Sequence, residues 1–361
     1  MARFENNIMG LIPREEWLDI PFVVNNPQAN PVDELIGDVK TDNIVAYWES
    51  IAAEYQVPVM AQFHGFDTEA QKTFRIPVDT HNVEKGLIKV KIDQSERMRA
   101  LLRSGVQNDD MYDYVINDGI RLAEQVIQRT KVAKNEMLAT GQVTIKENDL
   151  DLTIDYGVPN AQKGLTIDFG TGATSPVDEQ LEALVQTALS GGNTLNGFMT
   201  SRATMNKLRK NTAIQKAVNG VNMVGQLVSN ADLRAYLSEE YGFDRIILND
   251  ATYGVPGATV AGRPHVVAKR LFPEAGITFF ATPNGGSKLG DGLWGDPPET
   301  DAGVEINNQV TGSGESPYVY ITQWSEHDPA VLWTKASTLF IPVLYNPTSL
   351  YIASATETTG T

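Results

Sequence analysis

The sequence lacks cysteine altogether, contains only four histidines among 361 residues, and is poor in positive charge. Without cysteine the chain cannot form disulfides, thiolate–zinc sites, iron–sulfur clusters or a thiol nucleophile. Its 29 Lys and Arg are outnumbered by 45 Asp and Glu, which gives a net charge of −16. That balance argues against non-specific nucleic-acid binding by the whole surface, because phosphate contacts require clustered Lys and Arg.

Long hydrophobic runs are also missing. No stretch approaches the roughly 20 apolar residues that span a bilayer, and no apolar core follows a basic start, so a secretory signal is not expected. Hydrophobic residues make up 42% of the chain and charged residues 20%, which is typical of a globular protein. We expect a soluble protein with no membrane partner, made in a reducing compartment and long enough for two or more subdomains.

Motifs that would carry catalysis or bind a cofactor are absent as well. The histidines are scattered along the chain: His64, His81, His265 and His327. Only His64 with Asp67 comes near a metal-ligand spacing, and a loop histidine is the simpler interpretation. The Asp-Phe-Gly at 168–170 lacks the other kinase motifs, and the glycine-rich run at 170–175 lacks the GK[ST] ending of a phosphate loop. The sequence predicts no catalytic, cofactor-binding or metal-binding residue.

Residues 1–59 are interpreted as an arm rather than a domain. Prolines interrupt the first thirty-odd positions and favour extended backbone, yet Phe4, Ile8 and Trp17 are too apolar for a solvated tail. The first 60 residues carry three positive and ten negative charges, so the arm is both apolar and acidic. We expect it to lie against its own body or against a neighbouring copy.

Two helices are expected in the first half of the chain. An Asp cap and apolar residues at spacings of three and four predict a helix over 42–55. The strongest helical pattern covers 109–138, where a broad apolar stripe faces a polar one and Gly141 marks the end. A helix of that length predicts a spine on which other elements are arranged.

Residues 71–92 predict a β-hairpin whose two strands alternate apolar and polar residues. The segment 79–86 between them supplies turn residues. The lysines indicate an exposed edge or a patch for an acidic partner rather than a nucleic-acid patch. A two-stranded hairpin is marginal alone in water, so it needs a partner surface. With the arm, it supplies the residues expected to contact neighbouring subunits: Phe4, Ile8, Trp17, Lys72, Phe74, Arg75, Ile76, Ile88, Lys89, Val90 and Lys91.

The rest of the chain alternates helix and strand. Residues 160–300 predict a mixed sheet flanked by helices, among them one over 201–218 and one over 231–240. Residues 281–317 are rich in glycine and proline and are expected to form loops. Strands follow between 318 and 355.

The order of these features resembles the major capsid proteins of tailed bacteriophages, of the lambda capsid protein E type. Five segments carry the resemblance: LTIDYGVP (152–159) after the long helix, the proline-acidic helix opening at 175–188, the apolar strand and capped helix at 197–218, the glycine–aromatic–glycine run at 288–301, and the Asp-Pro and Asn-Pro strands at 327–355. Their occurrence in this order along one chain makes the resemblance specific.

The resemblance implies an α+β fold, that of the tailed-phage major capsid proteins. Its expected parts are an N-terminal arm (1–59), an extended β-hairpin loop (60–96), a peripheral domain with the spine helix (97–159 and 315–361) and an axial domain with a mixed sheet and helices (160–314).

The same resemblance implies a structural protein and not an enzyme, with no cofactor. Its copies would form the pentamers and hexamers of an icosahedral head shell that encloses packaged double-stranded DNA without sequence-specific binding. A separate scaffold protein, a portal and a decoration protein are the other candidate partners. The shell would assemble, first as a procapsid, in the host cytoplasm and end in the virion.

Alternatives from other classes stay open at this stage. An encapsulin-like nanocompartment shell shares the fold but stores cargo enzymes. An uncharacterised α/β enzyme would require a constellation that the motifs do not supply, and a tail or connector protein would assemble into tubes or rings instead of closed shells.

Overall fold

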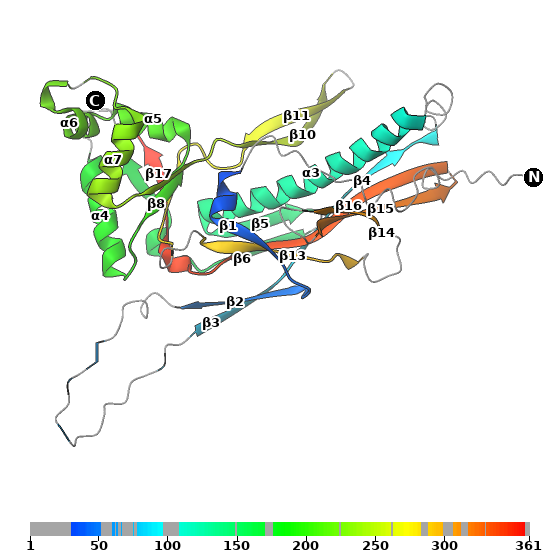
Figure 1. Ribbon diagram of the computed structural model, residues 1–361, viewed down its shortest axis with the longest axis horizontal. Coiled ribbons are helices and arrows are strands. Elements are labelled where there is room, and N and C mark those ends of the chain that lie inside the picture. The colour runs from blue at the N-terminus through cyan, green and yellow to red at the C-terminus, as the bar shows by residue number, and fades with distance from the viewer. Residues whose placement is uncertain are drawn as a thin grey trace, which may run out of the picture.

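The computed structural model describes residues 30–51, 60–61, 63, 66, 75, 78–96, 108–148, 150–169, 176–223, 225–260, 263–282, 288–298, 306–311, 317–328 and 330–357. In Figure 1, a long helix and a long sheet run side by side and lead into a group of shorter helices at one end of the molecule. The expected α+β architecture is confirmed.

The spine helix α3 (Asn108–Thr140) is present with nearly the predicted bounds. Its 33 residues span about 50 Å at 1.5 Å per residue. Its apolar stripe includes Leu122, Val126 and Met137, all buried in one hydrophobic core. The helix ends at Gly141, which has a φ of +72° and donates its N–H to the Met137 carbonyl. A left-handed residue is least strained as glycine, which is why this position stops the helix.

The long sheet lies against α3. Its strand order is β1 (Ile36–Lys40), β13 (Gly290–Gly295), β16 (Ala330–Leu344), β15 (Pro317–His327) and β14 (Ile306–Thr311), and β4 (Gly86–Gln94) also pairs with β16. Only β1 and β13 are parallel neighbours; β16 is antiparallel to β13, β15 and β4. The predicted C-terminal strands are therefore confirmed, and β16 forms the centre of the sheet.

The expectation of loops over 281–317 is wrong for two stretches, because β13 and β14 lie in this range and β13 pairs with both β1 and β16. A side chain at Gly290 would place its Cβ 1.9 Å from the Val343 carbonyl oxygen, and one at Gly292 would meet the Phe340 ring at 2.7 Å. The glycines that suggested a loop are thus the residues that allow close strand packing.

The helix predicted over 42–55 is also wrong: β2 (Val45–Ile51) is a strand, paired antiparallel with β3 (Val78–Glu84). Ala46, Trp48 and Ser50 are buried while the residues between them are exposed. This period of two is the pattern of a strand with one covered face. The spacing of three and four that predicted a helix joins Trp48, on the covered face of β2, to Ile44, which lies before the strand and is 57% exposed.

The hairpin predicted over 71–92 is not formed as expected. β3 pairs with β2, β4 pairs with β16, and most of the segment expected to be a turn belongs to β3. The chain crosses from one sheet to the other at Lys85, which is buried. Its ammonium donates a hydrogen bond to the Thr41 carbonyl and its backbone N–H donates one to the Ile44 carbonyl, both just before β2. A two-stranded ribbon does exist, but β2 and β3 form it; we call it the β2–β3 ribbon.

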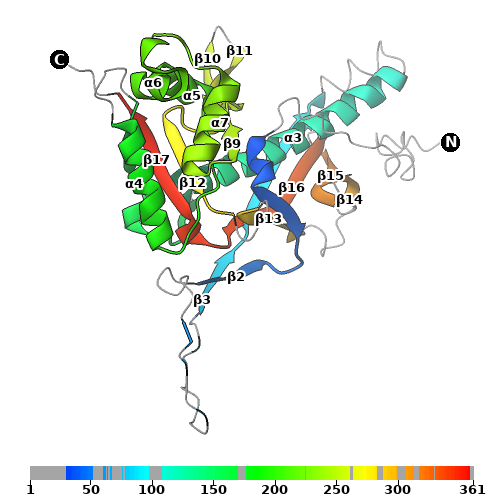
Figure 2. The same ribbon diagram turned by 60° about the vertical axis from the view of Figure 1, so that its left-hand side comes forward.

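A second unit contains a five-stranded mixed sheet covered on one face by helices. The strand order is β7 (Leu165–Asp168), β17 (Leu350–Thr356), β12 (Gly276–Phe280), β8 (Gly197–Thr200) and β9 (Arg245–Leu248). The helices are α4 (Val177–Ser190), α5 (Arg202–Lys210), α6 (Thr212–Asn219) and α7 (Asn230–Tyr241). They enclose a separate hydrophobic core against the sheet, so the predicted mixed sheet with flanking helices is confirmed (Figure 2).

One predicted helix is divided in two. The helix expected over 201–218 breaks at Asn211, whose ψ of 131° is extended and whose side chain accepts hydrogen bonds from the N–H groups of Ala213 and Ile214. Asn211 therefore caps α6 and ends α5 at the same point.

The two units meet at the C-terminal end of α3. Thr278 donates to the Leu138 carbonyl at 2.8 Å, and the Asn249 side chain donates to that of Asn135 at 2.7 Å. All four residues are buried. The remaining strands form two hairpins, β5 (Gln142–Glu147) with β6 (Leu150–Asp155), and β10 (Thr252–Val260) with β11 (Arg263–Arg270).

Candidate assembly surfaces

The β2–β3 ribbon extends from the lower edge of the molecule in Figure 1. Its inner face is held by Trp48, whose ring stacks on His81 at 5.2 Å and lies 6.0 Å from the Tyr156 ring. Its outer face leaves large apolar side chains in solvent, since Tyr47 is 62% exposed and Val78 46%. The ribbon is thus anchored on one side and uncovered on the other.

The strand β4 brings together four of the residues predicted to contact neighbouring subunits. Ile88 and Val90 are half-buried and pack against the core of their own subunit, while Lys89 and Lys91 point outward. The Lys91 ammonium lies 4.0 Å from the centre of the Trp333 ring. Of these four residues, the two lysines are the ones that remain available to a partner.

The other predicted contact residues are not brought into this group. Arg75 is described and exposed. Six of the predicted residues lie outside the described part of the chain: Phe4, Ile8, Trp17, Lys72, Phe74 and Ile76. The His64–Asp67 pair and the run at 170–175 also lie outside it.

The beginning of the described chain is fixed to the spine helix by a buried cation. The Lys134 side chain is 2% exposed and forms ion pairs with Asp33 at 3.0 Å and Asp38 at 2.8 Å. Asp38 also accepts a hydrogen bond from the Trp294 indole at 2.7 Å. Because a buried charge is costly unless it is paired, this cluster fixes where the segment before β1 joins the body.

A second polar cluster ties the root of the β2–β3 ribbon to the long sheet. The Lys85 ammonium donates to the carbonyl and hydroxyl oxygens of Thr41 at 2.7 and 2.6 Å and to the Trp294 carbonyl at 3.0 Å. Burial lowers the pKa of Lys85, because desolvation disfavours the charged form. Nearby, Lys40 forms an ion pair with Asp296 at 2.8 Å.

The Asp296 carboxylate shows which influence prevails in this cluster. Burial alone would raise its pKa, but hydrogen bonds from Lys40 and Tyr320 stabilise the charged form, and the pKa of Asp296 falls below its usual value. The cluster therefore fixes the ribbon root most firmly when Asp296 is ionised.

The β10–β11 hairpin is a second ribbon, which the sequence analysis missed. We call it the β10–β11 ribbon. Every described side chain of β11 is exposed, including Val266 at 65% and Val267 at 43%. The signal that could have indicated it is the Ala-Gly pair at 261–262 between two runs of β-branched residues, a hairpin pattern.

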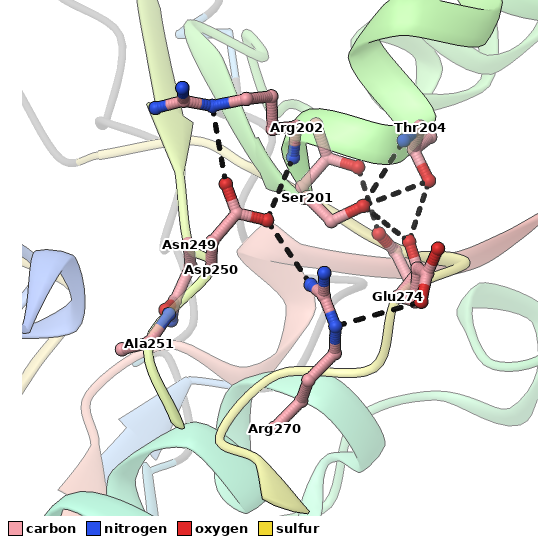
Figure 3. A network of polar contacts seen from close by, with 10 residues as sticks. Ser201, Arg202, Thr204, Asn249, Asp250, Ala251, Arg270 and Glu274 are labelled. Carbon is pink, nitrogen blue, oxygen red and sulfur yellow. Dashed lines mark hydrogen bonds and ion pairs between the residues drawn. The ribbon is translucent and has the colours of Figure 1, made fainter. Parts of the chain in front are cut away.

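Figure 3 shows how the β10–β11 ribbon is attached to the second unit. Asp250, just before β10, receives a hydrogen bond from the Arg202 backbone N–H at 3.2 Å and one from the Arg270 guanidinium at 3.1 Å. Arg270, the last residue of β11, also lies 3.6 Å from the Glu274 carboxylate. These charges join both strands of the ribbon to the N-terminus of α5.

The Glu274 backbone completes the attachment. Its carbonyl accepts hydrogen bonds from the hydroxyls of Ser201 and Thr204, both at 2.6 Å, while the Ser201 hydroxyl also caps α5 by accepting from the Thr204 N–H. Ser201 and Thr204 are buried, so the root of the ribbon is rigid although its strands are exposed.

The interior of the second unit provides packing and no array of polar groups. A small cavity between the sheet and the helices is lined by apolar side chains and by Thr200 and Thr204, whose hydroxyls already donate to backbone carbonyls. Among the described residues, no three His, Asp or Glu side chains gather as metal ligands. Within the same residues, no helix has the length and apolar character to cross a membrane.

Comparisons with solved structures relate the fold to other proteins. The chain superposes with a TM-score of 0.50 on a phage-related protein from Bordetella bronchiseptica RB50, at 11% identity over 92% of this chain and 95% of that one. The mature capsid of bacteriophage PhiM1 also gives 0.50, at 10% identity over 92% and 88%. A virus-like particle from Pyrococcus furiosus gives 0.43, at 11% identity over 91% and 94%. The two superpositions with a TM-score of 0.50 show a shared fold.

Comparison of the sequence identifies the family. No curated protein matches the chain, but the model of the phage major capsid protein E family matches residues 64–355. This range covers the β2–β3 ribbon only from its second strand and includes the spine helix, the long sheet without β1, nearly all of the five-stranded sheet and the β10–β11 ribbon. The chain therefore belongs to the phage major capsid protein E family and is a structural component of the capsid shell of a virion, not an enzyme.

Proposed function

We propose that copies of this chain form the pentamers and hexamers of an icosahedral head shell and that this shell encloses packaged double-stranded DNA. The family match over residues 64–355 is the observation that carries the proposal. The exposed faces of the two ribbons support it, because apolar side chains such as Tyr47 and Val266 gain free energy when a partner covers them. A separate scaffold protein, a portal and a decoration protein complete the proposed set of partners.

The contact residues belong to the same proposal. The arm, with Phe4, Ile8 and Trp17, would lie on a neighbouring copy, as would the part of the extended loop that contains Lys72, Phe74, Arg75 and Ile76. On β4, the exposed Lys89 and Lys91 would face an acidic neighbour, whereas Ile88 and Val90 are already covered largely within the subunit.

The domain division is proposed with adjustments. The starting division is an arm over 1–59, an extended loop over 60–96, a peripheral domain around α3 and an axial domain within 160–314. Strand pairing favours moving β1, β4, β13 and β14 to the peripheral domain, because all four belong to the long sheet, and β2 to the extended loop, because it pairs with β3. It favours moving β17 to the axial domain, because β17 pairs with β12 and β7.

Electron microscopy of the purified full-length chain, alone and with the scaffold protein of the same phage, tests the proposal. Closed shells with fivefold and sixfold capsomers are expected. Tubes or open rings would instead favour a tail or connector protein. A chain that stays monomeric at high concentration with the scaffold supplied would overturn the proposal.

A further inference from the structure

The two ribbons carry opposite charge. β2 and β3 contain Glu49, Asp79 and Glu84 and no Lys or Arg, whereas β10 and β11 contain Arg263, Lys269 and Arg270 and no Asp or Glu. The whole chain has a net charge of −16. The 19-residue range 252–270, from the start of β10 to the end of β11, contains no carboxylate, so its net charge is positive. Opposite charge favours contact between the two ribbons and disfavours contact of either ribbon with its own kind.

Both ribbons also expose apolar side chains beside those charges. On the outer face of the β2–β3 ribbon, Tyr47 is 62% exposed and Val78 46%. On the β10–β11 ribbon, Val267 is 43% exposed and shares one face with Lys269, whereas Val266 is exposed on the opposite face. Each surface therefore combines area that gains from losing water with charges that fix the orientation of a partner.

The ribbons lie at opposite edges of the subunit, so they cannot reach one another within one chain. In Figures 1 and 2, which differ by a rotation about the vertical axis, the β2–β3 ribbon is at the lower edge and the β10–β11 ribbon at the upper edge. Two different, complementary patches at opposite edges are what a head-to-tail contact between identical subunits requires.

The glycines of β10 shape the surface of its ribbon. A side chain at Gly254 would come within 2.6 Å of Val266, and one at Gly257 within 2.9 Å of Val267. The absence of a side chain at Gly257 lets Val267 lie close to the neighbouring backbone, on the face that also carries Lys269, and Gly254 does the same for Val266 on the opposite face. The ribbon is rigidly attached at its root, and a preorganised surface loses little conformational freedom on binding.

From these observations we propose that the β10–β11 ribbon of one subunit docks on the outer face of the β2–β3 ribbon of a neighbouring copy. Val267 covers Tyr47 and Val78, and Lys269, on the same face as Val267, meets Glu49 and Glu84, which are exposed. This contact rests on the proposed shell assembly and assigns to it a specific pair of surfaces.

Excision of the β10–β11 ribbon provides the first test. Tyr253 and Lys269 are paired across the ribbon, so residues 254–268 can be replaced by Asn-Gly, a sequence that favours a two-residue hairpin turn. The root network of Asp250, Arg270 and Glu274 remains intact. We expect a subunit that melts cooperatively at the wild-type temperature but no longer forms closed shells. Normal shells from this variant would overturn the proposal.

Charge exchange provides the second test, independent of the excision. Arg263→Glu with Lys269→Glu should raise the protein concentration needed for assembly by about 3- to 10-fold, because the attraction between the two oppositely charged ribbons is lost and repulsion replaces it. Glu49→Lys with Glu84→Lys should do the same, and the four changes together should restore assembly. A matched control reverses two exposed lysines of the helical unit, Lys210→Glu with Lys216→Glu. Adding Glu49→Lys and Glu84→Lys to this control should not lower the protein concentration that it needs for assembly.

The outcomes separate this proposal from the more general one. If the wild-type chain with its scaffold forms no shells, shell assembly itself fails. If wild-type shells form but the fourfold variant shows no rescue, only the ribbon contact is wrong. If the Arg263→Glu, Lys269→Glu variant closes shells at the wild-type concentration but its particles lose packaged DNA, the ribbon faces nucleic acid and the proposed contact is overturned.

Discussion

The body of the subunit and its two ribbons use charge in opposite ways. In the body, Lys134 and Lys85 are buried and hydrogen-bonded to fixed partners. On the ribbons, Glu49, Glu84 and Lys269 are exposed, and the described residues provide them with no ion pair. Removing a buried partner leaves the other charge uncompensated, whereas an exposed charge is solvated by water. Charges in the body therefore determine the fold of one subunit, and charges on the ribbons are free to determine its contacts.

The largest expected effect breaks the body through the backbone. Gly290→Ala should destabilise the subunit by about 3 kcal/mol, because overpacking against rigid backbone forces strands apart, and the new Cβ would meet the Val343 carbonyl at 1.9 Å. Denaturant unfolding measures the change. The control is Gly86→Ala in the same sheet, where the nearest atom is 3.6 Å away. Equal stability of the two variants would contradict close packing at β13.

A smaller loss is expected when the buried ion pair is removed. Lys134→Met should cost about 2–3 kcal/mol, less than a fully buried pair because Asp33 and Asp38 are partly solvated. Thermal and denaturant unfolding should both show it. Lys146→Met, which removes a 65% exposed cation from the β5–β6 hairpin, is the control and should change stability by less than about 0.5 kcal/mol. Similar effects in both variants would remove the distinction between body and surface charge.

The pH dependence of stability sharpens the same distinction. The pKa of Asp296 is lower in the folded protein than its ordinary value of 3.8, so the unfolded chain binds more protons as pH falls through this range. Its contribution is fully present above the unfolded pKa and is lost as pH falls through the folded pKa. Unfolding of wild type and Asp296→Asn, compared from neutral pH down to about 3, should show a difference that shrinks with acid. A difference independent of pH would contradict this assignment.

The smallest effect on subunit stability is expected on the β10–β11 ribbon. Val266→Ser with Val267→Ser should change the free energy of unfolding by no more than about 0.5 kcal/mol, because both side chains are already largely in water. The same variant should assemble poorly in light-scattering and microscopy assays. Loss of stability without loss of assembly would reverse the comparison and place the valines in the subunit core.

Among the candidate contact residues, the sequence correctly predicted one strand but not the strand with which it pairs. It placed Ile88, Lys89, Val90 and Lys91 on one strand with alternating faces, as observed in β4. It assigned that strand the wrong partner, because alternation identifies a covered face without identifying what covers it. It also missed the β10–β11 ribbon, whose importance depends on exposure and on its place at one edge of the subunit.

The sequence by itself determined the elements whose signals are local. The spine helix, the capped start of the helix at Ser201, the stop at Gly141 and the strand character of β15 to β17 follow from periodicity and backbone preference within a few residues. Tertiary structure alone decided that a glycine-rich run becomes the buried strand β13 and that β2 is a strand rather than a helix. Those outcomes depend on partners distant in sequence, since a strand gains its hydrogen bonds and its covered face only from neighbours that the fold brings beside it.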